Sequence, residues 1–65
     1  MPVISIAMHK TPPETRKRLI TALTETAATV TDIPAQSFIV LINEFPEESI
    51  GIGGRTLLEL KNNRG

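Results

Sequence analysis

The 65-residue chain contains no cysteine, tryptophan or tyrosine, one histidine and only two phenylalanines. Without cysteine there is neither a disulfide nor a thiolate metal site, and the single histidine, His9, cannot build a zinc centre. Seven basic and seven acidic residues cancel, so the chain lacks the basic surface, and with it the aromatic stacking surface, typical of nucleic-acid-binding proteins. We therefore expect no metal site and no nucleic-acid partner, and nothing in the composition calls for a cofactor.

Long hydrophobic runs are missing as well. No apolar stretch approaches the ~20 residues of a membrane-spanning helix, and the N-terminus lacks a basic region followed by a long apolar one. We expect a cytoplasmic protein without membrane association. The length predicts a single domain, residues 1–65, and a chain this short buries only about 60% of its unfolded surface. Because disulfides and metals are excluded, oligomerisation is the remaining means of stabilising it.

The N-terminal stretch combines a strand pattern with an unusual second residue. The apolar residues Ile4, Ile6 and Met8 recur with the period of two that defines a strand. Pro2 follows the initiator methionine, and a small second residue such as proline permits removal of Met1. The mature chain then begins with a secondary amine, which acts as a base if desolvation or a nearby positive charge lowers its pKa. The alternative is that Pro2 only starts the strand, where its missing N–H costs nothing.

Residues 11–32 predict one helix. Residues 11–14, Thr-Pro-Pro-Glu, have the form of a capping box between Thr11 and Glu14, with Pro12 at the first helical position. The helix should end near Asp32, because Ile33 precedes a proline and is pushed out of the α region. The helical stripe expected to face the sheet consists of Leu19, Ile20, Leu23, Thr26, Ala27 and Val30.

Residues 38–42, Phe-Ile-Val-Leu-Ile, form an unbroken apolar run that is short and rich in β-branched residues, so they predict a strand buried on both faces. A strand, a helix and a second strand form a right-handed β-α-β unit with parallel strands. The helix covers one face of this sheet, and since the chain has no second helix, another subunit must cover the other face. We expect an α/β (α+β) fold, a β-α-β unit with a C-terminal hairpin.

Glycines 51, 53 and 54 follow a polar loop, residues 44–49. A dinucleotide-binding fingerprint needs a preceding strand, and a P-loop needs Lys-Ser/Thr after its last glycine. Neither is present, so the glycines indicate a tight hairpin with positive φ angles. Residues 56–60 form a short apolar segment suited to contact a neighbouring subunit, and residues 61–65 are expected to fray.

These features together resemble the 4-oxalocrotonate tautomerase family over essentially the whole chain. The Met-Pro start, the single helix, Asp32-x-Pro34, the second strand ending in Glu44 and the glycine hairpin all fit, while the loop near residues 9–13 is one residue shorter. The resemblance implies a tautomerase-like fold, subunits that pair their sheets into dimers, and three dimers in a homohexamer. It also implies that Pro2, freed of Met1, is the general base for keto-enol proton transfer on a small 2-hydroxy-dienoate or 2-oxo acid.

The departures from the family concern substrate binding. Family enzymes acting on 2-hydroxymuconate hold the substrate with two arginines and desolvate the proline with an aromatic residue. Here the second arginine position is Ile39 and the aromatic position is Ile50. The first arginine falls in the shortened loop, where Lys10 and His9 are the nearest polar substitutes, and Arg55 stands where the family often has an acid. The candidate substrate-binding residues are Lys10, Arg55, Ile39 and Ile50.

The spacing of these candidates predicts a shared site. Pro2 and Lys10 lie at opposite ends of one strand, about 26 Å apart at ~3.3 Å per residue, and a lysine side chain cannot span that distance. A cation that reaches Pro2 from this loop must therefore come from another subunit. Ile39, in contrast, should lie beside Pro2 on the adjacent parallel strand, where it would desolvate the amine.

Two other functions stay open. In the wider superfamily a proline that remains protonated acts as an acid for hydration, dehalogenation or decarboxylation, and Glu44 or Glu47 could be the acidic partner of such a reaction. The chain could also be a non-catalytic subunit of a homo- or hetero-oligomer, in which Pro2 is retained for packing.

Overall fold

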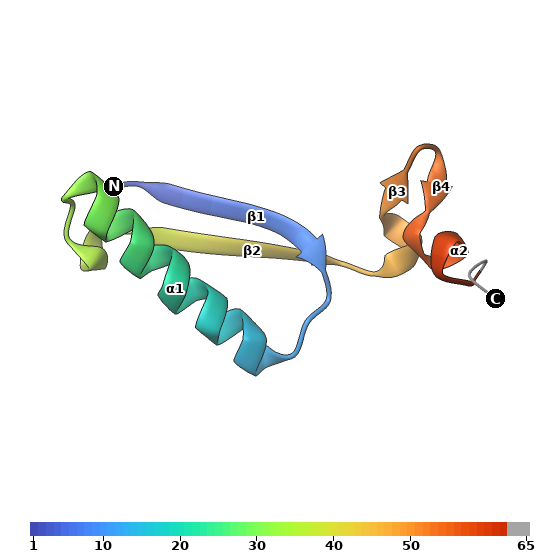
Figure 1. Ribbon diagram of the computed structural model, residues 1–65, viewed down its shortest axis with the longest axis horizontal. Helices are drawn as coiled ribbons and strands as arrows, with labels where there is room; N and C mark the ends of the chain where they lie inside the picture. The colour runs from blue at the N-terminus through green and yellow to red at the C-terminus, as the bar shows by residue number, and fades with distance from the viewer. Residues whose placement is uncertain (63–65) are drawn as a thin grey trace.

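The computed structural model describes residues 1–62 (Figure 1). The strands and helices, in chain order, are β1 (Val3–His9), α1 (Pro13–Thr31), β2 (Ile39–Phe45), β3 (Gly51–Ile52), β4 (Arg55–Thr56) and α2 (Leu57–Asn62), with 3₁₀ turns at Ala35–Ser37 and Glu47–Ser49. β1 and β2 are parallel, and β3 and β4 form an antiparallel hairpin. The predicted β-α-β unit with a C-terminal hairpin is confirmed. The expected fraying was wrong for Lys61 and Asn62, which belong to α2, and residues 63–65 lie outside the described residues.

The second strand starts one residue later than the predicted apolar run, because Phe38 ends the preceding 3₁₀ turn. It also continues past Ile42 to Phe45, because its pairing with β1 extends beyond the apolar run. Val3 lies opposite Ile39 at one end of the ladder and His9 lies opposite Phe45 at the other. Asn43 and Glu44 are polar and end the hydrophobic pattern, but the ladder partners supplied by β1 keep them in the strand. The parallel register therefore carries β2 to the same edge as the end of β1.

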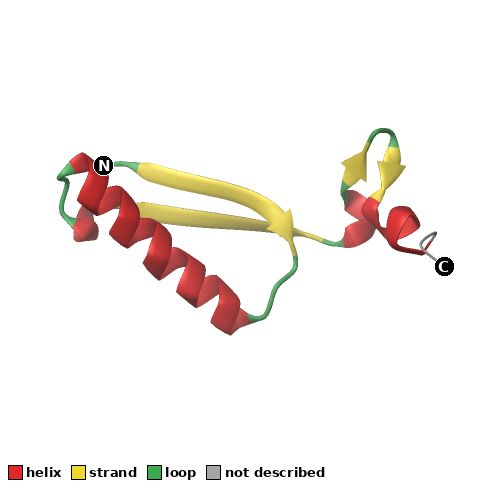
Figure 2. Ribbon diagram, viewed as in Figure 1, coloured by secondary structure: helices red, strands yellow, loops and turns green. Residues whose placement is uncertain are grey.

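Helix α1 covers one face of this sheet (Figure 2). The strand residues on this face are half-buried, as the alternating pattern predicts, and include Ile4, Ile6 and Met8. On the helix, half-buried side chains follow steps of four, Leu19, Leu23 and Ala27 in one row and Thr24 and Ala28 in the next. Rows of this kind wind around the helix axis.

The prediction that the helical stripe faces the sheet was therefore wrong for three of its residues. Ile20 and Thr26 lie to the side of the contacting rows and are exposed. Val30 is 79% exposed, because by the last turn of α1 the contacting row has rotated away from the direction in which Val30 points.

The ends of α1 confirm one prediction and contradict another. The helix ends as expected, with Asp32 as C-cap at φ 63° and its backbone N–H donating to the Ala28 carbonyl at 3.0 Å. The prediction of a capping box between Thr11 and Glu14 was wrong. Pro12 is the N-cap, Pro13 is the first helical residue, and no side chain caps the N-terminus. The Thr11 hydroxyl donates instead to a carboxylate of β2, at 2.8 Å.

The C-terminal hairpin turns through Gly53 and Gly54, whose φ angles are 60° and 87°. Two consecutive positive φ angles are the requirement of a type I′ turn, and the hairpin prediction is confirmed. A capping box that the sequence reading missed follows it. The Thr56 N–H donates to Glu59 Oε1 at 2.9 Å, and the Glu59 N–H donates to Thr56 Oγ1 at 3.0 Å. These contacts fold residues 57–62 into α2, so the expectation that the chain has no second helix was wrong.

No element of residues 1–62 covers the face of the β1–β2 sheet opposite α1. This open face carries Val3, Leu41 and Phe45, which are 54%, 49% and 42% exposed. None of the residues 1–62 is fully buried. The accessible surface of 4983 Å² exceeds the about 4,100 Å² that surface scaling gives for a monomer of this mass. The hairpin and α2 also project from the β-α-β unit along the 46 Å long axis (Figure 1). The open face and the projecting segment therefore leave more surface exposed than a compact monomer of this mass would have.

Candidate active site

Pro2 lies at the edge of the sheet where both parallel strands begin. Its carbonyl accepts a hydrogen bond from the backbone N–H of Ile39, at 3.0 Å. Pro2 is half-buried, while Met1 is 89% exposed and therefore accessible for removal. Ile39 is half-buried beside it, in the position that the parallel register predicts. The chain end that would carry the amine is thus held in place by the sheet.

The other three candidate residues are remote from Pro2 of the same chain. Lys10 follows the far end of β1. Ile50 and Arg55 belong to the C-terminal hairpin segment, which lies at the opposite end of the molecule from the N-terminus (Figure 1). Only Ile39 is brought to Pro2 within one chain. A site that combines Pro2 with Lys10, Arg55 or Ile50 therefore requires at least two subunits.

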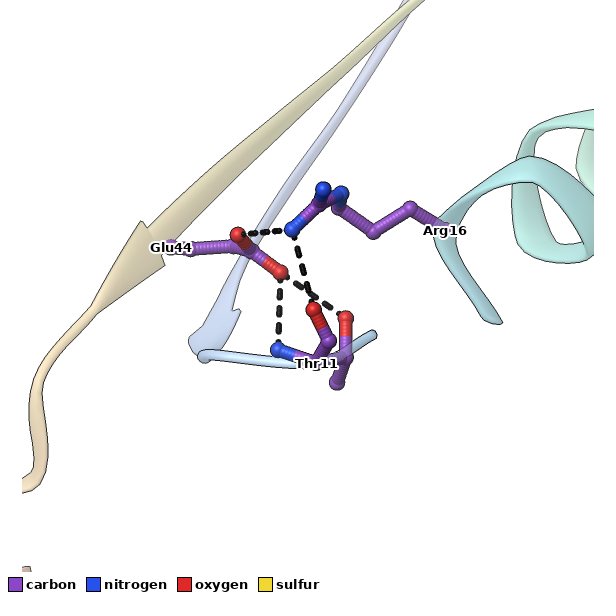
Figure 3. Close-up of polar contacts among 3 residues, drawn as sticks. All are labelled: Thr11, Arg16 and Glu44. Atoms are coloured by element: carbon purple, nitrogen blue, oxygen red, sulfur yellow. Dashed lines mark hydrogen bonds and ion pairs between the residues drawn. The ribbon is translucent and has the colours of Figure 1, made fainter. Parts of the chain in front are cut away.

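A polar cluster that the sequence reading did not find joins the β1–α1 loop to the end of β2 (Figure 3). Glu44 Oε2 accepts hydrogen bonds from the backbone N–H and the hydroxyl of Thr11, at 2.9 Å and 2.8 Å. Arg16 Nη1 donates to Glu44 Oε1 at 2.7 Å and to the Thr11 carbonyl at 2.9 Å. We call these three residues the loop clamp.

The register explains how the loop clamp forms. Glu44 lies opposite Met8 on the face that α1 covers, and Arg16 stands in the first turn of the helix, so the helix brings its guanidinium over the strand end. Sequence spacing alone carried no signal for this, because Thr11 and Glu44 are 33 residues apart. A carboxylate at the helix-covered end of β2, read together with the register, would have pointed to a basic partner on α1.

The loop clamp keeps Glu44 ionised. Hydrogen bonds from the hydroxyl and then the backbone N–H of Thr11 lower the pKa of Glu44 from its usual value of 4.5, partial burial opposes this, and the charge of Arg16 lowers the pKa further. A carboxylate with a lowered pKa and two partners is poorly suited to donate a proton near neutral pH. Glu47, the other candidate acid, forms an ion pair with Lys61.

An open hollow of about 430 Å³ lies between the end of β1 and the C-terminal segment, and its lining includes His9, Ile52, Leu57 and Leu60 but not Pro2. Within residues 1–62 no group of three or more His, Cys, Asp or Glu side chains is placed to hold a metal ion. Neither α1 nor α2 has the length and hydrophobicity of a membrane-crossing helix.

The fold and the proline at its sheet edge define a class of small β-α-β subunits, and comparisons identify the family. The family model described as tautomerase enzyme matches residues 2–58. Among solved structures, apo unFused 4-OT is 40% identical, with 91% of this chain and 98% of that chain covered and a TM-score of 0.86. No curated protein matches significantly. The chain belongs to the tautomerase family, and the resemblance seen in its sequence is confirmed.

Two further structures extend this comparison. TomN, a 4-oxalocrotonate tautomerase homologue in the tomaymycin biosynthetic pathway, is 26% identical, with 98% of this chain and 100% of that chain covered and a TM-score of 0.94. A heterohexamer 4-oxalocrotonate tautomerase from Chloroflexus aurantiacus J-10-fl is 30% identical, with 92% and 98% covered and a TM-score of 0.87. The structural match therefore includes the C-terminal segment as well as the β-α-β unit.

Proposed function

We propose that the protein is a keto-enol tautomerase in which the Pro2 amine, freed by removal of Met1, is the general base. The observation that carries the proposal is the position of Pro2. Its carbonyl accepts a hydrogen bond from the backbone N–H of Ile39 at the start of the parallel β1–β2 ladder. The strand holds the terminus while leaving the amine without a preceding residue. Family membership supports an isomerase of this kind.

The proposed reaction moves one proton. The neutral amine removes a proton from the enol hydroxyl of a 2-hydroxy-dienoate and becomes a cation, electrons shift through the conjugated chain, and the same proton is returned to carbon. The amine ends neutral, so no cofactor is consumed. Apolar neighbours lower the pKa of such an amine by desolvation. Ile39 supplies this in its own chain, and Ile50 would supply it from a neighbour.

The substrate is proposed to be a small carboxylic acid bound by a cation from another subunit. Lys10 and Arg55 are the candidates, because both are exposed and both lie far from Pro2 of their own chain. A cation placed at the oxygen where negative charge develops stabilises the enolate. The site is therefore proposed to form between subunits.

We also propose a homo-oligomer, most simply a hexamer built as a trimer of dimers. The uncovered sheet face, the projecting hairpin and the remote candidate cations support it, since symmetric pairing would cover the first and join the others. A relative is a heterohexamer, so assembly with a second, different chain is an outcome that the mass of the purified protein would reveal.

The test begins with mass spectrometry, which should show that Met1 is absent. The protein is then assayed for ketonisation of phenylenolpyruvate and 2-hydroxymuconate, alongside Pro2→Ala and the control Pro34→Ala, which removes an exposed proline elsewhere. Proton-transfer catalysis contributes about 10²–10⁴-fold, and Pro2→Ala should lose a rate factor in this range while Pro34→Ala keeps its activity. Equal rates for wild type and Pro2→Ala would refute the proposal.

A pH–rate profile separates this function from its alternatives. A neutral base predicts activity that rises as Pro2 loses its proton below neutrality. Titration of Pro2 well above neutrality would favour a hydratase, dehalogenase or decarboxylase with a protonated proline. Inactivity with every substrate in a correctly assembled oligomer would favour a non-catalytic subunit.

A further inference from the structure

The loop between β1 and α1 is fixed at Thr11. The N–H and the hydroxyl of this residue donate to Glu44, and its carbonyl accepts from Arg16. The Glu44 side chain is 17% exposed and the Arg16 side chain is 34% exposed, so water reaches the arginine more than the carboxylate, and both contacts are charge-assisted. Every polar group of Thr11 is therefore committed within the loop clamp.

Lys10 directly precedes Thr11 in the chain and is held by this arrangement through the backbone, without a side-chain hydrogen bond to Thr11, Arg16 or Glu44. Before it, His9 is still in register with Phe45 in the β1–β2 ladder. After it, Thr11 is clamped, and Pro12 follows with φ −62°. The backbone of Lys10 is thus fixed from both sides. Its side chain is exposed, and within residues 1–62 its ammonium takes part in no hydrogen bond or ion pair.

The basic residues that have ion-pair partners stabilise the fold. Arg16 forms an ion pair with Glu44 and donates a hydrogen bond to the Thr11 carbonyl. Lys61 forms an ion pair with Glu47. Arg16 would have to leave Glu44 without its charged partner in order to bind a substrate. Lys10, in contrast, has no ion-pair partner among the described residues 1–62, and it follows the end of β1 opposite to Pro2.

We propose that Thr11, Arg16 and Glu44 are positioning residues that hold Lys10 so that its ammonium binds the substrate carboxylate in the site of a neighbouring subunit's Pro2. This inference rests on the proposed function. Ordering the backbone of one residue on binding would lower the substrate affinity by a factor of about 5–30. The loop clamp orders the backbone of Lys10 before the substrate binds, so this loss of affinity is avoided. Its effect should therefore fall on substrate binding more than on the proton transfer.

The test is a double-mutant cycle measured with phenylenolpyruvate, a monocarboxylate. Lys10→Ala should raise KM about 10–100-fold, the range of a hydrogen bond between charged groups. Glu44→Gln keeps the shape of the side chain but removes its charge, and should raise KM about 3–10-fold with kcat changed less than about twofold. In the Lys10→Ala background, Glu44→Gln should have no further effect on KM, because the residue it positions is gone.

Two further variants serve as a control and as a milder replacement in this test. Lys17→Met, on the exposed helix surface next to Arg16, is the matched control and should behave as wild type. Thr11→Val removes one hydroxyl and is the milder variant if Glu44→Gln does not assemble. Its KM should also rise, and the rise should also vanish without Lys10. Circular dichroism and light scattering confirm that each variant keeps its fold and mass.

Three results would overturn the inference. If the effects of Lys10→Ala and Glu44→Gln multiply, the loop clamp only stabilises the fold. If Lys10→Ala leaves KM unchanged while Pro2→Ala abolishes activity, the tautomerase function stands but Lys10 does not bind the substrate. If Pro2→Ala is as active as wild type, the proposed function fails, and this inference fails with it.

Discussion

Leu41 is the residue whose replacement should reveal how far the fold depends on assembly. It lies in the middle of β2 on the open sheet face and is 49% exposed in the isolated chain. We expect Leu41→Asp to leave no folded monomer. The replacement puts a carboxylate on the surface that the second subunit of the proposed oligomer would cover.

The magnitude follows from the surface area. The isolated chain exposes 4983 Å², roughly 900 Å² more than a compact monomer of its mass, and covering this excess at ~25 cal/mol per Å² supplies at most about 20 kcal/mol. A core of this size alone rarely supplies more than about 3–5 kcal/mol. Losing the leucine contact costs about 1 kcal/mol per subunit, and an unpaired carboxylate in the interface costs several more. Both copies of a two-fold interface would carry the aspartate, so these losses weaken association, and a subunit that dissociates keeps only its own core, which is too small to hold the fold.

The assay is light scattering with circular dichroism at neutral pH. Wild type should be folded at a mass well above the 7.1 kDa of one chain, and Leu41→Asp should lose helix signal as it dissociates. Val30→Asp is the matched control, because Val30 is 79% exposed in the last turn of α1. An acid there costs about 0.3–1 kcal/mol through the helix dipole, so the oligomer should persist. A folded wild-type chain with a mass near 7.1 kDa would refute the reasoning.

Two further predictions concern charge. Because Thr11 and Arg16 hold the pKa of Glu44 below its usual 4.5, the unfolded chain takes up this proton before the folded one as the pH falls. These contacts therefore stabilise the fold fully above the pKa of Glu44 in the unfolded chain, and their contribution declines as the pH falls below that pKa. The free energy of unfolding, measured with urea between about pH 6 and pH 3, should show this decline in wild type, and Glu44→Gln should make the pH dependence weaker. Ile39→Arg places a cation beside Pro2 and should raise kcat/KM for the diacid 2-hydroxymuconate about tenfold relative to phenylenolpyruvate; an unchanged ratio in an assembled variant would contradict a substrate site at Ile39.

The local pattern of the chain was enough to predict its elements. The period of two in Ile4, Ile6 and Met8 and the apolar run of β2 predicted the parallel strands. Pro34 predicted the end of the helix, and the glycines at 53 and 54 predicted the hairpin turn. These predictions held because each depends on backbone sterics or side-chain periodicity within a few residues. The position of Ile39 beside Pro2 followed from the same parallel register.

Contacts between distant segments decided the rest. Thr11 and Glu14 have the spacing of a capping box, but the carboxylate of Glu44 competes for the Thr11 hydroxyl and is available only once β2 lies beside β1. The helix stripe was misjudged at Val30, because the angle at which α1 crosses the sheet is a property of packing. Thr56 and Glu59 do form a capping box, which was overlooked because the segment was read only for its apolar residues.

For the site, the sequence by itself determined that a proline follows the initiator methionine, that Lys10 lies a strand's length away, and that isoleucine stands at position 39. Only the tertiary structure decided that Arg16 and Glu44 are committed to Thr11, which leaves Lys10 unpaired on a fixed loop within residues 1–62. The physical reason is range. Periodicity and backbone preferences act between near neighbours in the chain, whereas an ion pair 28 residues apart exists only after the fold has brought its partners together.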